Sequence, residues 1–172
     1  MNVFCNGFPK SGNHALVKAV QLIGHPCEVN HRSCADGLPP NVTHHILVTR
    51  DPRNIIVSWL RFNREAVTPG TFLSKFRRFQ RGTLDEDMSD FEWWLGSAHV
   101  VKYEDLVANA KAMVGIAVYL GTPYIAGAWE NLEGHTVTYN KVHSDYRNIW
   151  TNQVQDDWSA EGGDDLLKRW GY

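Results

Sequence analysis

The segment that most constrains the fold is a glycine-containing loop near the N-terminus, GFPKSGNH at residues 7–14. A short apolar run from Asn2 to Cys5 precedes it and is typical of a buried strand. After the loop, apolar residues recur every three or four positions from Leu16 to Ile23, which is the period of an amphipathic helix. Gly24 and Pro26 end that pattern. The N-terminus therefore predicts a strand, a tight loop and a helix in direct succession.

Apolar runs and helical patterns alternate along the rest of the chain. Buried strands are expected at His45–Thr49 and His99–Lys102, with a less regular one near Cys27–Asn30. The helical period is found in five further segments: residues 55–63, 71–80, 90–95, 109–120 and 164–170. Strands that alternate with helices predict an α/β fold, in which helices flank both faces of a central parallel sheet.

Length and composition fit one folded domain. The 172 residues contain no internal repeat or long polar linker, so a single domain over residues 1–172 is expected. Lys plus Arg is 17 and Asp plus Glu is 19, and the resulting net charge of −2 excludes a strongly basic nucleic-acid-binding protein.

The sequence also predicts the compartment. No apolar run approaches the ~20 residues that a membrane-spanning helix needs, and no secretory signal is visible. The three cysteines, Cys5, Cys27 and Cys34, do not form a disulfide framework. We therefore expect a cytoplasmic protein with neither a nucleic acid nor a membrane as partner. The sequence leaves the oligomeric state open.

The N-terminal loop has the features of an anion-binding site. Ligands of open parallel sheets bind beyond the carboxyl ends of the strands, where a helix N-terminus offers free N–H groups and a positive dipole end. Gly7 and Gly12 permit close backbone approach, Lys10 adds a charge and Ser11 adds a hydroxyl. In a Walker A loop the lysine follows the second glycine, whereas here it precedes that glycine. The loop predicts a phosphate or sulfate site of another kind; the alternative is an ordinary turn with a solvated lysine.

A second candidate anion site lies in RDPRNIIVS, residues 50–58. Arg50 follows a predicted strand, so it should face the same sheet edge as the N-terminal loop, and Ser58 comes two helical turns later. A guanidinium with a hydroxyl suits a dianionic phosphate. The alternative is that Arg50 pairs with Asp51 or Asp105 in a structural salt bridge.

Taken together, these segments resemble the sulfotransferases that use 3′-phosphoadenosine 5′-phosphosulfate (PAPS). PKSGNHA at residues 9–15 is similar to the family's PKSGTTW loop, and residues 50–58 are similar to its RDPRDVVVS element. VVKYEDL at residues 100–106 matches a third family feature. Arg147 and the terminal Trp170-Gly171-Tyr172 resemble a fourth. The four segments lie in the family's order over nearly the whole chain, which implies a P-loop-like sulfotransferase architecture.

The resemblance implies roles for individual residues. Lys10 would contact the phosphosulfate near its bridging oxygen and take part in catalysis. The 5′ phosphate would be cradled by the next four residues, Ser11, Gly12, Asn13 and His14. The 3′ phosphate would be held by Arg50 and Ser58, joined by Arg147, and the adenine would be contacted by Tyr103 and Thr136. His14 and Ala15 depart from the family's Thr and Trp, and loss of that aromatic face should loosen adenine binding.

Sulfuryl transfer also needs a base that takes the proton of the acceptor, and histidine titrates near neutrality. In cytosolic family members a histidine lies between the first helix and the arginine strand, shortly before Leu-Pro, and His31 resembles that residue. His44, His45 and Glu28 remain alternatives.

Two further questions concern metals and rival functions. His25, Cys27, His31 and Cys34 are possible zinc ligands, but four ligands within ten positions are crowded for a tetrahedral site, and the family uses no metal. The resemblance implies PAPS as co-substrate and a small molecule or carbohydrate as acceptor. A P-loop nucleotide kinase and a non-catalytic binder of adenosine 3′,5′-bisphosphate (PAP) are the alternative functions.

Overall fold

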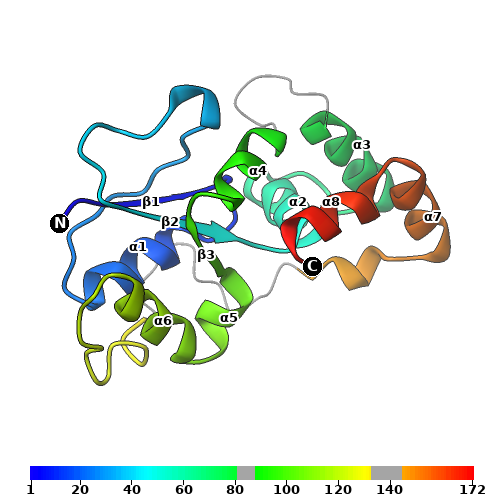
Figure 1. Cartoon of the computed structure of the whole chain (residues 1–172). Helices are drawn as coiled ribbons and strands as arrows, with labels where there is room; N and C mark the ends of the chain where they lie inside the picture. Colours follow the sequence, from blue (N-terminus) through cyan, green and yellow to red (C-terminus); the bar gives the residue numbers. More distant parts are fainter. Residues whose placement is uncertain (81–87, 133–144) are drawn as a thin grey trace.

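Three parallel strands form the centre of the fold. The computed structural model describes residues 1–80, 88–132 and 145–172. The strands β1 (Val3–Gly7), β2 (His44–Thr49) and β3 (His99–Lys102) pair in the order β1-β2-β3. Figure 1 shows helices on either side of this sheet. The predicted α/β class is confirmed, and the structure is a single α/β domain with a three-stranded parallel sheet.

Helices make up most of the rest of the described chain. The α-helices are α1 (Asn13–Leu22), α2 (Pro52–Phe62), α3 (Pro69–Gln80), α4 (Ser89–Leu95), α5 (Tyr103–Ala108), α6 (Lys111–Tyr119), α7 (Asn152–Ala160) and α8 (Gly163–Trp170). Short 3-10 helices lie at Cys34–Asp36 and Tyr146–Ile149. All the predicted helices are present, whereas α5 and α7 were not predicted. Within the described ranges, no helix is long and apolar enough to cross a membrane.

One face of the sheet packs on α1, α5 and α6. Ile46, Val48 and Val101 point to this side and form one buried cluster with apolar residues of those helices, such as Leu16 and Ile116. The alternation of side chains along the strands sends neighbouring residues to the opposite face.

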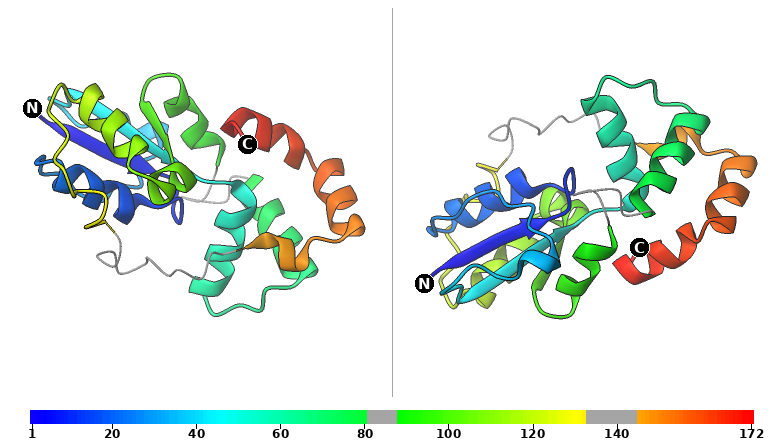
Figure 2. Two further views of the ribbon diagram at one scale, coloured as in Figure 1. Left: turned by 90° about the horizontal axis from the view of Figure 1, so that it is seen from below. Right: turned by 90° about the horizontal axis from the view of Figure 1, so that it is seen from above.

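A second buried cluster involves α2, α3, α4, α7 and α8. It begins at Leu47 of β2 and Phe8 of the N-terminal loop, and extends to Phe76 and Trp158, whose rings stack with centroids 4.1 Å apart. Figure 2 shows α2, α3, α7 and α8 gathered beside the sheet, beyond the carboxyl ends of its strands. The N-terminal loop and the start of α2 therefore lie between the two buried clusters.

The segment before β2 is held by side-chain hydrogen bonds rather than by a fourth strand. The expectation of a strand near Cys27–Asn30 is wrong, since the pairing there is one isolated bridge between Val29 and Cys5. The buried Asn6 side chain binds the backbone of Arg32 in both directions, donating to its carbonyl and accepting from its N–H, each at 2.9 Å. This pair draws the loop that carries His31 to the carboxyl end of β1.

The end of the chain docks onto α5. The Tyr172 hydroxyl donates to Glu104 Oε2 at 2.7 Å, and the Lys102 ammonium donates to the Gly171 carbonyl. Burial raises the pKa of Tyr172, as do the charge and hydrogen bond of Glu104, so this hydroxyl keeps its proton. The YEDL and WGY segments of the sequence therefore meet in space.

Candidate functional site

A cavity of about 220 Å³ lies at the carboxyl ends of β1 and β2. Residues predicted from four separate parts of the sequence line it: Lys10, Gly12, Asn13, His14, His31, Arg50, Ser58 and Tyr103. Pro9, Ala15 and Phe62 complete the lining. The topology thus brings the two candidate anion sites and the candidate base to one place.

The N-terminal loop requires glycine where it meets Tyr103. Gly12 has φ +111°, and a Cβ there would lie 2.3 Å from the Tyr103 ring. The close approach lets α1 begin at the cavity, with its first free N–H groups at the lining. Lys10 is also left-handed, at φ +71°, a conformation that costs a non-glycine residue ~1–2 kcal/mol.

Lys10 presents a cation that lies beside an aromatic ring. Its Nζ lies 3.1 Å from the centroid of Phe62, whose side chain is 66% exposed. Burial lowers the pKa of Lys10. Within the described residues, no carboxylate lies at ion-pair distance from this ammonium, so its charge is available to a bound anion.

Arg50 is the second cation, and it is 8% exposed. Its Nη1 donates to the Lys10 carbonyl at 3.2 Å, and its guanidinium lies 4.7 Å from the centroid of Tyr103. Its Nε is buried without a hydrogen-bond partner in the described structure. Asp51 pairs instead with Arg53, at 2.7 Å, and caps α2, so the alternative Arg50–Asp51 salt bridge is not formed.

Two hydroxyls accompany the cations. Ser11 is fully buried behind the loop, and its Oγ also lacks a hydrogen-bond partner within the described structure. Ser58 is half-buried on α2 and lines the cavity with Arg50. Burying the Ser11 hydroxyl without a partner costs free energy, whereas the Ser58 hydroxyl lies where an anion in the cavity could accept from it.

His31 enters the cavity from the loop before β2. Its Nδ1 lies 2.7 Å from Asn13 Nδ2 and 3.0 Å from the Gly7 carbonyl oxygen. Partial burial lowers the pKa of His31; the hydrogen bond to Gly7 opposes this shift, while the nearby His14 and Lys10 add to it. The lowered pKa favours the neutral ring, which is the form that a general base needs.

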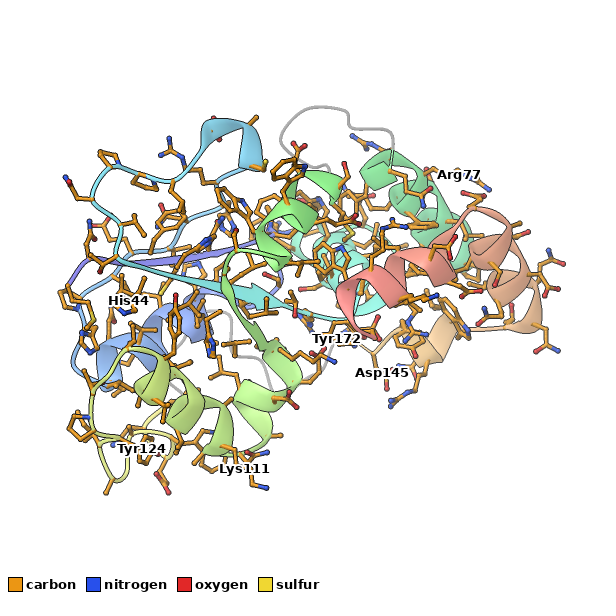
Figure 3. The ribbon with its side chains drawn as sticks, viewed as in Figure 1. His44, Arg77, Lys111, Tyr124, Asp145 and Tyr172 are labelled. Carbon is orange, nitrogen blue, oxygen red and sulfur yellow. The ribbon has the colours of Figure 1, made fainter. Side chains whose placement is uncertain are left out.

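The structure places the alternative bases elsewhere. His44 lies at the amino end of β2, away from the cavity, and Figure 3 shows it at the far end of the sheet from Tyr172. His45 is buried between Phe4 and Trp94, and burial lowers its pKa to about 4. Glu28 is exposed and is not part of the cavity lining.

Of the remaining predicted contacts, one lies away from the cavity and one falls outside the described part of the chain. Arg147 is exposed, lies 3.6 Å from Asp145 and is absent from the cavity lining. Thr136 lies outside the described residues.

Of the four possible zinc ligands, His25 contacts Thr122 Oγ1 at 3.4 Å. Among the described residues, no three His, Cys, Asp or Glu side chains group as a metal site would require.

Sequence reasoning missed Phe62 as a cavity residue. It stands four positions after Ser58 on α2, so both occupy the same helix face, which the helical period could have indicated.

Comparison with known proteins shows similarity at the level of structure. No family model matches the chain, and no curated protein matches its sequence. Among solved structures, mouse sulfotransferase SULT7A1 complexed with PAP is similar, with a TM-score of 0.70 and 15% sequence identity. The alignment covers 98% of this chain and 84% of that one. At this identity the likeness establishes the fold: the chain has the α/β fold of that sulfotransferase.

Proposed function

We propose that this protein is a PAPS-dependent sulfotransferase. It transfers a sulfuryl group from PAPS to a hydroxyl or amine of an acceptor, which would be a small molecule or a carbohydrate. The shared fold with a sulfotransferase whose structure contains PAP supports binding of a related nucleotide. The resemblance of the sequence segments 9–15 and 50–58 to the family's nucleotide-binding motifs supports the same donor.

The observation that carries the proposal is that the residues of two candidate anion sites line one cavity. Lys10 and the start of α1 form the first, and Arg50 with Ser58 forms the second. A nucleotide with separate 5′ and 3′ phosphates fits such a pair, because the 5′ phosphate would meet Lys10 and the free N–H groups of α1, and the 3′ phosphate would meet Arg50 and the Ser58 hydroxyl. A nucleotide with one phosphate group would leave the second site empty.

The proposed reaction is an in-line displacement at sulfur. The acceptor oxygen or nitrogen attacks the sulfur as the bond from sulfur to the bridging oxygen breaks, and PAP leaves with that oxygen. His31 takes the acceptor proton, while Lys10 and the α1 N-terminus stabilise the charge that grows on the leaving phosphate. Arg147 and Thr136 remain predicted contacts of the 3′ phosphate and the adenine.

Two alternatives compete with this proposal. A P-loop nucleotide kinase is disfavoured because the loop lysine does not occupy the Walker A position. A non-catalytic PAP binder would keep the cavity without turnover, and His14 and Ala15, which differ from the family's residues, are the features that favour it.

A turnover experiment separates the three functions. The protein is incubated with radiolabelled PAPS and pools of alcohols, phenols, sugars and amines, with and without EDTA, and PAP release and label transfer are followed. We expect acceptor-dependent release that survives EDTA. Phosphoryl transfer from ATP with a strict Mg²⁺ requirement would indicate the kinase, and tight PAP binding with no transfer to any pool would indicate the binder.

A further inference from the structure

Three polar atoms meet beside the cavity, and together they fix the His31 ring. Asn13 Nδ2 lies 2.7 Å from the Gly7 carbonyl oxygen and 2.7 Å from His31 Nδ1, which is itself 3.0 Å from the same oxygen. Asn13 is 3% exposed, so its amide is held inside the protein. The described contacts of the ring nitrogens all fall on Nδ1, so Nε2 is the nitrogen left to face a ligand.

The two contacts of Nδ1 require opposite protonation of that atom. The Gly7 oxygen accepts, so Nδ1 must carry a hydrogen to bind it. The Asn13 amide nitrogen donates, so Nδ1 must carry a lone pair to bind it. Neutral imidazole carries its proton on one of its two nitrogens. If Nδ1 donates to the Gly7 oxygen, Nε2 has a lone pair. If Nδ1 accepts from the Asn13 amide, Nε2 carries the proton.

The amide orientation of Asn13 follows from its neighbours. Turning the amide over would bring Oδ1 to within 2.7 Å of the Gly7 oxygen, two acceptors in contact. Gly7 is also the position at which a Cβ would lie 2.4 Å from Asn13 Oδ1, so the asparagine packs closely over glycine. The donor nitrogen is therefore the atom that faces His31.

We propose that Asn13 is a positioning residue that sets the tautomer of His31, and with it the fraction of rings whose Nε2 can accept a proton. The inference rests on the proposed function, in which Nε2 takes the acceptor proton. Because Asn13 is also the first residue of α1, one side chain connects the phosphate-binding end of that helix to the base.

The charged and titratable groups around the ring do not replace this control. Lys10 and His14, from the loop and from α1, both disfavour the imidazolium through their charge. Arg32, the next residue in the chain, directs its guanidinium to the Asp36 carbonyl at 2.8 Å. These groups change the protonation of the ring as a whole, whereas contacts at Nδ1 distinguish its two neutral forms.

Imidazole ¹⁵N chemical shifts of the ligand-free protein test the inference without any turnover. The shifts report which ring nitrogen carries the proton, and His31→Gln identifies the His31 signals by their loss. In the wild type we expect the tautomer with the proton on Nε2 to be populated. In Asn13→Ala the balance should move toward the Nδ1-protonated form by about 2- to 10-fold, as expected for loss of one hydrogen bond. The pKa of His31 should rise, because the amide no longer favours the unprotonated Nδ1.

A second variant separates loss of the donor from loss of the side chain. Asn13→Asp keeps the size of the side chain and replaces the donor with an acceptor, so it should shift the balance in the same direction and raise the pKa further. Because its carboxylate would face the Gly7 oxygen, urea unfolding of both variants confirms that they are folded. Asn30→Ala is the matched control: Asn30 precedes His31 in the same loop, and its amide donates to the Glu28 carbonyl at 3.1 Å. The control should leave the tautomer ratio within about 2-fold of the wild type.

Three results would overturn the inference. They are a wild-type ring wholly protonated on Nδ1, a tautomer ratio unchanged in both Asn13 variants, and a tautomer ratio that moves toward the Nε2-protonated form in those variants. Calorimetric titration of the wild type with PAP tests the proposed function separately, because Asn13 is itself a predicted contact of the 5′ phosphate. Tight PAP binding with an unchanged tautomer ratio removes the role of Asn13 and leaves the sulfotransferase proposal. If the tautomer ratio shifts in the Asn13 variants but PAP does not bind, Asn13 does set the tautomer of His31 and the sulfotransferase proposal is wrong.

Discussion

Lys10 and Arg50 point to an anionic ligand because the fold buries part of each cation and, among the described residues, places no carboxylate at ion-pair distance from either. Removing a cation from water costs free energy unless a partner replaces the lost solvation. Lys10 meets the Phe62 ring and Arg50 meets the Tyr103 ring, which are weaker partners than an anion. A ligand with one phosphate at each cation would pair with both charges.

Replacing Lys10 should separate catalysis from stability. Lys10→Gly removes the ammonium and also relieves the left-handed backbone, so the free energy of unfolding should stay within about 1 kcal/mol of the wild type. Turnover should fall by about 10²–10³-fold, as for loss of one group that stabilises developing charge. Urea unfolding and steady-state rates provide the measurements. Lys18→Gly, on α1 outside the cavity lining, is the control for lost charge; equal rates in wild type and Lys10→Gly would contradict the assigned role.

Replacing His31 tests the base. His31→Ala should lower kcat by about 10²–10⁴-fold with little change in PAP affinity, because the base acts on the acceptor. Since the pKa of His31 is lowered, the rate of the wild type should rise with pH below the usual histidine range and be level at neutral pH. The pH–rate profile and PAP calorimetry measure the two effects.

The alternatives supply the controls for this prediction. His44→Ala, His45→Ala and Glu28→Ala should each keep kcat within a few fold once folding is verified, because none of the three lines the cavity. If one of them loses kcat while His31→Ala does not, the base is misassigned. If none of the four matters, proton removal at these residues does not limit the reaction.

At the scale of elements, the sequence predicted the parts that have strong local signals. The strand His99–Lys102 has the predicted bounds, and β2 begins one residue earlier than predicted. β1 continues through Asn6 and Gly7, which look like a turn locally, because they pair with Leu47 and Val48 of β2. The helix α7 was missed because its buried face consists of Val154 and Trp158, too few apolar residues to show a period.

In the candidate site, too, the residues that could be predicted are those with a strong local signal in the sequence. The residues near α1 and α2 could be predicted because each lies at a strand end within a short motif. The hydrogen bonds of Asn13 with His31 could not, because they join residues 18 positions apart through a loop of irregular structure. The helical period could have placed Phe62 on the cavity face of α2, but its contact with Lys10 depends on how α2 leaves the sheet.

The docking of the C-terminus gives a prediction at this scale. Tyr172→Phe removes the hydroxyl that donates to the charged Glu104 carboxylate. That carboxylate still accepts from the Asp51 backbone N–H, at 3.2 Å. We expect a loss of about 1.5 kcal/mol, the low end for a bond to a charged group because both side chains are half-buried. The melting temperature should fall by roughly 3–6 °C in calorimetry. Tyr146→Phe, at a tyrosine whose ring lies against Arg53, is the control; equal melting of Tyr172→Phe and wild type would contradict the docking role.

At the scale of the whole molecule, the buried ring of His45 makes stability depend on pH. The native pKa of about 4 lies below the ordinary 6.5, so the unfolded chain takes up a proton first as the pH falls. The contribution of His45 to the free energy of unfolding has its full value above pH 6.5 and decreases as the pH falls toward 4. From pH 7 to pH 5 this one residue should cost about 2 kcal/mol. The lowered pKa values of His31 and His99 act in the same direction.

His45→Phe tests this account of acid sensitivity. Both ring nitrogens of His45 are buried without partners in the described structure, so an aromatic ring without them should be tolerated between Phe4 and Trp94. Urea unfolding at pH 7 and pH 5 should show a smaller difference between the two pH values in the variant. His44→Phe, at the half-buried neighbour, is the control; a pH dependence unchanged by His45→Phe would show that this ring does not carry the effect.

The central claim is that one cavity recognises a nucleotide with both 5′ and 3′ phosphates, and calorimetric titration with PAP and with AMP tests it most directly. The account predicts much tighter binding of PAP than of AMP. It also predicts that Arg50→Ala weakens PAP binding by about 10- to 150-fold, as for loss of ~1.5–3 kcal/mol at a charged hydrogen bond, and changes AMP binding far less. Equal affinity of the wild type for the two nucleotides would contradict it.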